Sequence, residues 1–374
     1  MASPRRLLIF IPSMGGGGAE RVVANLANHW ADAGWYITVV TLASRKLDFY
    51  ELRPAVQRVA LELAGDSGNA LEGLWNNVRR VIALRRLLRE AQPDFALGIM
   101  TSANVLLAFA AAGVGIRAIG SEHVHPPQYP VGALWGWLRH LTYRRLDAVA
   151  ALTSESADWL KTRLGIRRVW VIPNAAPWPL PSQQPRLSPE SICPAGRHLL
   201  LAVGRLHRQK GFDWLLESFE GLAKKYPNWD IVILGEGPLR SALEAQRRTL
   251  GLEARVFLPG RVGNLGVWYD RAELYVMSSR FEGFGNTLAE ALTYGVPAIS
   301  FNCDTGPRDI VRHEIDGLLV PPEDVAGLAR AMDRMMGNAD LRLQFSRRAV
   351  EARERFSIRR IAGMWEKLFE EIRK

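Results

Sequence analysis

The chain has 374 residues, of which 48% are apolar and 23% charged, a composition typical of globular proteins. This length suits two domains, and 33 Gly with 21 Pro exclude collagen-like and broadly disordered chains. The formal net charge of +10 favours an anionic partner such as nucleic acid, a phosphorylated ligand or an anionic membrane. The 2 cysteines cannot build a disulfide framework or a structural zinc site by themselves.

Short apolar runs alternate with helical periodicity in the first half, which predicts a parallel α/β sheet. The predicted strands cover residues 7–11, 37–42, 59–63, 95–100, 118–121, 148–152 and 169–172. The apolar run 7–12 is too short for a secretory signal, so we expect no targeting segment. The uncharged stretch 95–116 could span a bilayer by length, but its polar and Gly residues favour a buried strand followed by an Ala-rich helix.

A Pro-rich stretch from Pro173 to Pro194 interrupts this alternation and is interpreted as a linker. The alternation then resumes, with strands predicted at 198–203, 231–234, 256–258, 274–277 and 298–301, and an amphipathic helix at 359–374. The chain is therefore predicted to be α/β, with two Rossmann-like domains at 1–175 and 197–356, a linker at 176–196, and a cleft between the domains.

Loops after strands are the candidate sites, because ligands of open parallel sheets bind at the carboxyl ends of the strands. Gly17 and Gly18 lie in a glycine loop after the first strand, where backbone N–H groups could contact a phosphate or sugar. A flexible turn is the alternative, and the loop is neither a dinucleotide fingerprint nor a P-loop. Without a third ligand, a metal at His123 and His125 is disfavoured, so His123 is expected to contact a sugar or phosphate unless it is an ordinary loop histidine.

Two basic residues lie in the loop after strand 198–203. Arg205 and Lys210 could hold one anionic group from two sides, although a solvated basic loop is the alternative.

The loop after strand 274–277 carries the most specific pattern. Gly283 and Gly285 shape a turn, and Asn286 or Thr287 can cap the next helix, whose free N–H groups suit a phosphate. The carboxylates at positions 282 and 290 suit the hydroxyl groups of a sugar or ribose.

Glu282 and Glu290, separated by seven residues, resemble the E-x7-E motif of retaining nucleotide-sugar glycosyltransferases of family 4. Similar blocks follow one another along nearly the whole chain, at 17–21, 171–174, 204–205, 210–211, 235–238, 257–260, 295–297 and 317–320. The resemblance implies a GT-B fold, in which two Rossmann-like domains face each other and the C-terminal helix, 357–374, packs back onto the first domain.

The resemblance also implies roles for individual residues. Arg205 and Lys210 would hold the donor diphosphate, Glu290 the ribose hydroxyls, and Glu282 the transferred sugar. The expected donor-binding residues are Gly17, Gly18, Arg205, Lys210, Val262, Gly283, Phe284, Gly285, Asn286, Thr287 and Glu290, and the expected catalytic residues are Glu282 and His123.

The expected chemistry needs neither a metal nor another cofactor. No two Asp residues lie two positions apart, so the sequence lacks the Asp-x-Asp motif of metal-dependent transferases. Positive charge from Arg205, Lys210 and a helix N-terminus could stabilise the departing diphosphate instead. The family implies retention of anomeric configuration.

The first domain is expected to hold the acceptor. Mixed Arg and Trp residues there suit a membrane headgroup interface, although solvated helix faces are the alternative. They are Arg79, Arg80, Arg85, Arg86, Arg89, Trp135, Trp137, Arg139, Tyr143, Arg144 and Arg145. We therefore expect a cytoplasmic protein, peripheral on the inner face of the membrane, with a lipid-diphosphate-linked saccharide as acceptor and no nucleic-acid partner.

The donor is expected to be a UDP-hexose or UDP-N-acetylhexosamine, because residues 303–309 resemble family members that use them. One alternative is a GDP-mannose-dependent mannosyltransferase. Another is a UDP-sugar 2-epimerase, for which only Glu122, His123 and Glu282 are acid/base candidates. The basic charge also leaves a non-enzymatic anion- or membrane-binding protein as an alternative.

Overall fold

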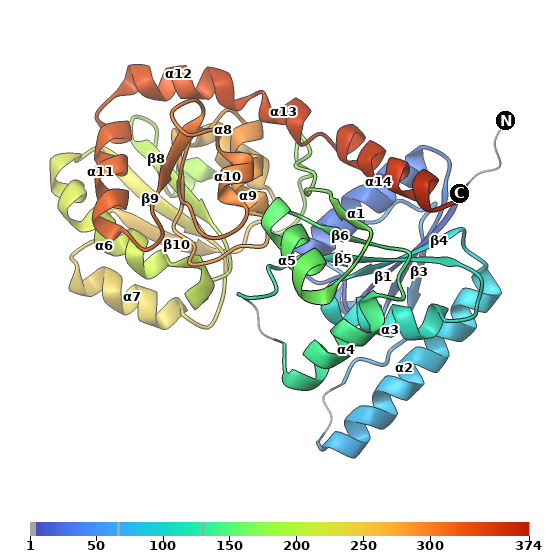
Figure 1. Ribbon diagram of the computed structural model, residues 1–374. Coiled ribbons are helices and arrows are strands. Elements are labelled where there is room, and N and C mark those ends of the chain that lie inside the picture. Colours follow the sequence, from blue (N-terminus) through green and yellow to red (C-terminus); the bar gives the residue numbers. More distant parts are fainter. Residues whose placement is uncertain (1–4, 66–67, 129–130, 374) are drawn as a thin grey trace. The chain divides into compact units, whose positions relative to one another are not determined.

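The computed structural model describes residues 5–65, 68–128 and 131–373 (Figure 1). The chain divides into two α/β units. The first unit contains Met1–Ala175 together with Ile358–Lys374, and the second contains Ala176–Ser357. Each unit is built on its own parallel sheet, as the alternation of strands and helices predicts.

The described part of the first unit forms a seven-stranded parallel sheet in the order β3-β2-β1-β4-β5-β6-β7. The strands are β1 (Arg6–Ile11), β2 (Tyr36–Thr41), β3 (Gln57–Ala60), β4 (Phe95–Ile99), β5 (Arg117–Glu122), β6 (Ala148–Ala151) and β7 (Val169–Val171). The helices of this unit are α1 (Gly18–Asp32), α2 (Ala70–Ala91), α3 (Thr101–Ala111), α4 (Ala133–Tyr143), α5 (Ser154–Leu164) and α14 (Ile358–Arg373), with a short 3₁₀ turn η1 (Arg45–Leu47).

Both faces of this sheet are buried, so its central strands are apolar throughout. Along β1, Leu7, Ile9 and Ile11 join a core shared with α1 and α14. Leu8 and Phe10 join the opposite core, which contains residues of α2, α3 and α5. Successive side chains of a strand point to opposite faces, which explains the division.

The last helix, α14, packs on the first unit. The ring of Phe369 stacks on Phe95 with 4.8 Å between centroids, and the Trp30 indole nitrogen donates to Glu366 at 3.1 Å. This placement agrees with the predicted return of the C-terminal segment to the first domain.

The stretch 95–116 forms β4 and the Ala-rich helix α3, as predicted. Among the described residues, no helix combines the length and the apolar character that crossing a bilayer requires.

The second unit contains, within the described residues, a six-stranded parallel sheet in the order β10-β9-β8-β11-β12-β13. The strands are β8 (His198–Val203), β9 (Trp229–Leu234), β10 (Val256–Gly260), β11 (Leu274–Met277), β12 (Ala298–Phe301) and β13 (Gly317–Val320). The helices are α6 (Phe212–Lys225), α7 (Arg240–Thr249), α8 (Leu265–Arg271), α9 (Asn286–Thr293), α10 (Pro307–Ile310), α11 (Val325–Met336), α12 (Ala339–Ala349) and α13 (Ala352–Arg355), with 3₁₀ turns η2 (Pro189–Ser191) and η3 (Arg208–Lys210). Strand β13 lies at the sheet edge and is absent from the predicted strands.

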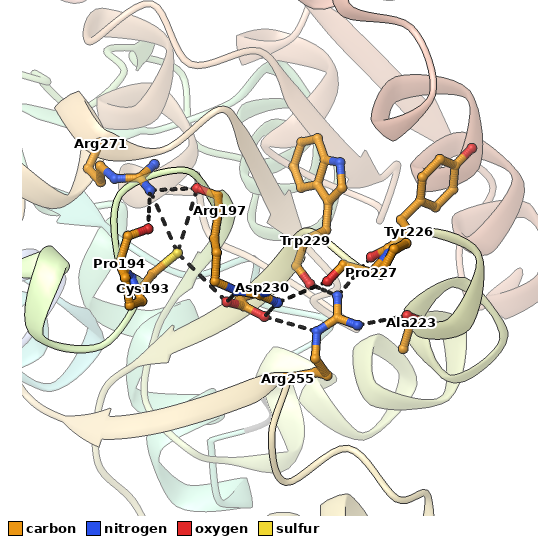
Figure 2. Close-up of polar contacts among 10 residues, drawn as sticks. All are labelled: Cys193, Pro194, Arg197, Ala223, Tyr226, Pro227, Trp229, Asp230, Arg255 and Arg271. Carbon is orange, nitrogen blue, oxygen red and sulfur yellow. Dashed lines mark hydrogen bonds and ion pairs between the residues drawn. The ribbon is translucent and has the colours of Figure 1, made fainter.

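The C-terminal end of the Pro-rich stretch is fixed to the second unit (Figure 2). Arg271 donates to the Pro194 carbonyl at 3.3 Å and to the Arg197 carbonyl at 2.5 Å. Arg197 in turn pairs with Asp230 at 2.6 Å, and Arg255 donates to the same carboxylate at 3.0 Å. Two guanidinium groups therefore neutralise one buried carboxylate and hold the incoming chain against β9.

Candidate active site

Strands β8 and β11 are neighbours at the point where the strand order of the second sheet reverses. In open parallel sheets this reversal separates the loops that follow the two strands and opens a ligand crevice at their carboxyl ends. The loop 204–211 follows β8, and the loop 278–285 follows β11. These two loops carry five of the expected donor-binding residues, and Asn286, Thr287 and Glu290 follow in α9 (Asn286–Thr293).

Glycine allows the two loops to approach each other closely. Gly211 has φ +61°, and a Cβ atom there would overlap the Ser278 carbonyl oxygen. Gly306, with φ +99° in the loop after β12, lies equally close to the Phe284 carbonyl oxygen. Both positions combine a left-handed backbone with a contact that excludes a side chain. A side chain at Gly211 would therefore separate the β8 and β11 loops, and one at Gly306 would separate the β12 loop from the β11 loop.

Arg280 ties the same loops together through its side chain. Its guanidinium donates to the Asp213 carboxylate at 2.6 and 2.8 Å and to the Arg208 carbonyl at 2.8 Å. It also lies over the Trp214 ring, 3.6 Å from the centroid. Sequence reasoning did not select Arg280, although its position directly before Phe281-Glu282 is a usable signal.

Lys210 and Glu282, 72 positions apart, meet at the centre of this arrangement. The Lys210 ammonium lies 2.5 Å from the Glu282 carboxylate, which also accepts from the Ser279 hydroxyl at 2.6 Å. Glu282 is only 6% exposed. Burial raises the pKa of the nearby Cys303 thiol to about 12, and the Glu282 charge adds to the shift, so this thiol stays protonated at neutral pH.

Glu290 is 1% exposed, on α9. The Tyr269 hydroxyl lies 3.2 Å from its carboxylate and 3.2 Å from the Thr287 carbonyl. Tyr275 donates to the Thr287 hydroxyl at 2.7 Å, and burial raises the pKa of Tyr275. The structure thus holds Glu290 and Thr287 in one buried polar group beneath the β11 loop.

The predicted helix cap at Asn286 or Thr287 is wrong. Helix α9 begins at Asn286, and the cap position belongs to Gly285, whose φ of +106° only glycine adopts readily; no side chain caps the helix. The Thr287 hydroxyl is instead directed to Val203 and Tyr275. The helix N-terminus at 283–286 therefore remains without a side-chain cap.

Arg205 and Val262 occupy different environments in the same unit. Arg205 is exposed, and within the described residues its side chain makes no ion pair or hydrogen bond. Val262 is buried, next to Gly263, whose N–H donates to the Pro185 carbonyl at 2.6 Å. Arg205 and Lys210 therefore do not share a partner here, and only Lys210 faces Glu282.

The first unit carries the remaining expected residues at the carboxyl ends of β1 and β5. Gly17 is the cap residue of α1, and Gly18 is its first residue. A Cβ atom at Gly17 would overlap the Glu20 carboxylate, whose pKa is raised by burial.

His123 follows β5 directly, and its imidazole is partly buried. Loss of hydration lowers the pKa of His123 to about 4, so the ring is neutral at physiological pH. His125 instead bonds the Ser156 hydroxyl through Nδ1 at 2.9 Å. Across the described residues, no three His, Cys, Asp or Glu side chains gather in a way that could hold a metal ion.

Glu122, directly before His123, belongs to a buried hydrogen-bond network that the sequence did not predict. Glu122 is 1% exposed and accepts hydrogen bonds from Tyr143 and from Thr101, the latter at 3.0 and 3.1 Å. Burial raises the pKa of this carboxyl group. Asn104 extends the network to Tyr143 at 2.9 Å. These contacts hold the end of β5 and make Glu122 a poor acid/base candidate for an epimerase.

Two residues expected at a headgroup interface are in fact buried. Tyr143 is fully buried because its hydroxyl bonds Glu122, and Arg139 is buried with its guanidinium 4.9 Å from the Trp159 ring centroid. Both sit on the inner face of α4.

Two family models and a curated relative match most of this chain in sequence. The family model described as glycosyltransferase family 4 matches residues 16–177, and the model described as glycosyl transferases group 1 matches residues 183–352. A Campylobacter jejuni relative, a GalNAc-α-(1->4)-GalNAc-α-(1->3)-diNAcBac-PP-undecaprenol α-1,4-N-acetyl-D-galactosaminyltransferase, is 26% identical over 98% of this chain and 99% of its own length.

Solved structures show the same fold. Sucrose-phosphate synthase from Thermosynechococcus elongatus aligns with a TM-score of 0.83 and 20% identity over 98% of this chain and 99% of that chain. HepE from Anabaena, solved in complex with UDP, aligns with a TM-score of 0.77 and 19% identity over 98% of this chain and 100% of that chain. Both similarities support the GT-B arrangement of two Rossmann-like domains.

Proposed function

Since this chain belongs to the family 4-like glycosyltransferases, we propose that it moves a hexose or N-acetylhexosamine from a UDP-sugar to a lipid-diphosphate-linked saccharide. The transfer serves surface polysaccharide or glycan assembly at the inner face of the cytoplasmic membrane. The second unit binds the donor, and the first unit binds the acceptor.

The observation that carries this proposal is the set of charged groups at the carboxyl ends of β8 and β11. The buried Lys210–Glu282 pair joins the two loops, and the buried Glu290 follows one helical turn into α9. We assign Glu290 to the ribose hydroxyls, Glu282 to the hydroxyls of the transferred sugar, and Lys210 to the donor diphosphate. The uncapped N-terminus of α9, with Gly283, Phe284 and Gly285 before it, offers backbone N–H groups to the donor.

We propose that the transfer retains the anomeric configuration and uses no metal. The acceptor oxygen bonds the anomeric carbon while the bond from that carbon to the diphosphate oxygen breaks. The acceptor proton passes to the departing phosphate oxygen, so UDP leaves with the electron pair. Lys210, Arg205 and the α9 dipole stabilise the charge that develops on UDP, and one such contact contributes about 3–4 kcal/mol.

In this proposal the neutral imidazole of His123 accepts a hydrogen bond from the transferred sugar, and Gly17 and Gly18 provide N–H groups of the first unit. The low pKa of His123 supports this assignment, because the ring keeps a free acceptor nitrogen at neutral pH.

The choice of UDP and of the acceptor draws on similar proteins. HepE was solved with UDP, and the name of the Campylobacter jejuni relative specifies an acceptor linked to undecaprenol through a diphosphate. The experiment must distinguish a UDP-sugar donor from the alternative donor, GDP-mannose.

The test is transfer of labelled sugar to an undecaprenyl-diphosphate-linked saccharide, with UDP-glucose, UDP-galactose, their N-acetylamino counterparts and GDP-mannose compared. Product from one UDP-sugar, with the anomeric configuration unchanged by NMR, supports the proposal. Product from GDP-mannose alone would reassign the donor. Epimerised donor without transfer would overturn the proposal in favour of a 2-epimerase.

A further inference from the structure

Helix α2 presents a continuous apolar stripe to solvent. Leu71, Leu74, Trp75, Val78 and Ile82 are all exposed, from 39% for Val78 to 81% for Leu71. Their spacing of three and four residues places them on one helical face. Leu84 and Leu88 on the same helix are buried against the sheet, so the core does not need the exposed stripe.

Helix α4 repeats this arrangement. Leu134, Trp137 and Leu141 are exposed at spacings of three and four, with Trp137 at 61%. Figure 1 shows α2 and α4 on the same side of the first sheet with α3 between them, and both helices pack against α3. Two exposed apolar stripes therefore lie on the outer surface of one helical layer. We call these eight residues the apolar face.

Basic side chains accompany the apolar face. Arg79 and Arg89 are exposed on α2, and Arg145 is exposed just after α4. Helix α4 contains no acidic residue. The two acidic residues of α2 are both exposed and both have partners: Glu72 accepts from the Gly68 N–H at 2.9 Å, and Glu90 is paired with Arg86 at 2.7 Å. The face thus combines aromatic and aliphatic groups with positive charge.

This combination of apolar and basic side chains favours an anionic lipid bilayer as the partner of the apolar face. Exposed apolar residues on two helices of one layer mark an interaction surface, and Trp and Leu flanked by Arg match helices lying in the headgroup region of an anionic bilayer. A second copy of the chain fits less well, because the cores of protein interfaces are depleted of charge and two identical basic faces repel each other.

We infer that the apolar face is the membrane-docking surface of the first unit, with Trp75 and Trp137 inserted among the lipids and Arg79, Arg89 and Arg145 bonded to anionic headgroups. The biological purpose of this membrane docking rests on the proposed function. Docking of this face would bring the first unit to the membrane that holds a lipid-linked acceptor.

The experiment measures cosedimentation of the full chain with vesicles of phosphatidylcholine alone or mixed with phosphatidylglycerol, at low and high salt. The variants are Trp75→Ser with Ile82→Ser, Trp137→Ser, and Arg79→Gln with Arg89→Gln. Leu343→Ser is the matched control, since Leu343 is 52% exposed on α12 of the second unit. Stabilisation by UDP is measured on every variant, because it reports folding and the donor site without lipid.

We expect binding only to the anionic vesicles, weakened by salt. Partitioning should fall about tenfold for each large apolar side chain removed and about fivefold for each Arg, while the control binds like the wild type. Equal binding by all variants, or no binding to anionic vesicles, would overturn the inference even if UDP binds. Loss of a solution dimer in the Trp variants would assign the face to a second copy instead. Vesicle binding without UDP stabilisation would leave the docking surface standing and defeat the proposed function.

Discussion

The Lys210–Glu282 pair provides a test that separates folding from donor binding. Lys210→Met removes the ammonium 2.5 Å from a carboxylate whose side chain is 7% exposed. Breaking a buried pair costs about 3–5 kcal/mol, and we expect about 3 kcal/mol because Ser279 still donates to Glu282. Glu282→Gln, whose amide can still accept from Ser279, should cost about 2 kcal/mol.

The double variant leaves no unpaired charge, so its total loss should stay near 2 kcal/mol. The coupling energy is then about 3 kcal/mol, at the upper end for residues in direct contact. Affinity for UDP should behave differently. Removal of the ammonium should weaken UDP binding about 10- to 100-fold in both the single and the double variant, because one charge-assisted hydrogen bond is lost.

Urea unfolding and titration calorimetry with UDP measure the two quantities. Lys225→Met is the matched control, since Lys225 pairs with Asp333 at the exposed surface of the same unit and should leave both quantities nearly unchanged. Additive stability losses would refute the buried-pair reasoning. Recovery of UDP affinity in the double variant would refute the assignment of Lys210 to the diphosphate.

Three further predictions follow from the site. Arg280→Lys keeps the charge but loses the bidentate bond to Asp213 and the stack on Trp214. We therefore expect KM for the donor to rise about tenfold, with a smaller change in kcat. An unchanged KM would contradict the positioning role of Arg280. Turnover should be unaffected by EDTA, and loss of activity restored by Mg²⁺ would contradict the metal-free mechanism. The pKa of His123 is about 4 in the folded chain and 6.5 unfolded, so the unfolded state binds more protons between these values. The free energy of unfolding should therefore fall by at most about 3 kcal/mol as the pH drops from 6.5 to 4. His123→Gln should reduce this acid sensitivity in urea unfolding. A variant with the same pH profile as the wild type would contradict the assignment of the effect to His123.

The fold could be predicted because its strands are buried on both faces. The apolar runs 198–203 and 274–277 coincide with β8 and β11 in full, since turn residues bound each run. Strand β13 is as short as β11 but was missed: it begins with glycine, a residue that disfavours strands, and it pairs along a single edge with β12.

The candidate site could be predicted as a set of loops but not as a set of contacts. The pairing of Lys210 with Glu282 depends on β8 and β11 being neighbours, and the strand order is not encoded in any local pattern. Tyr143 was predicted at a surface but is buried. Its neighbours in sequence suggest a surface helix, yet a buried partner, Glu122, decides its position.

Calorimetric titration of UDP, with EDTA present, tests most directly whether the second unit is a working donor site. The wild type should bind UDP, and Glu290→Gln should weaken binding about tenfold or more, because the ribose hydroxyls lose an ionised acceptor. The absence of UDP binding, or equal affinity in the Glu290→Gln variant, would contradict the donor site described here.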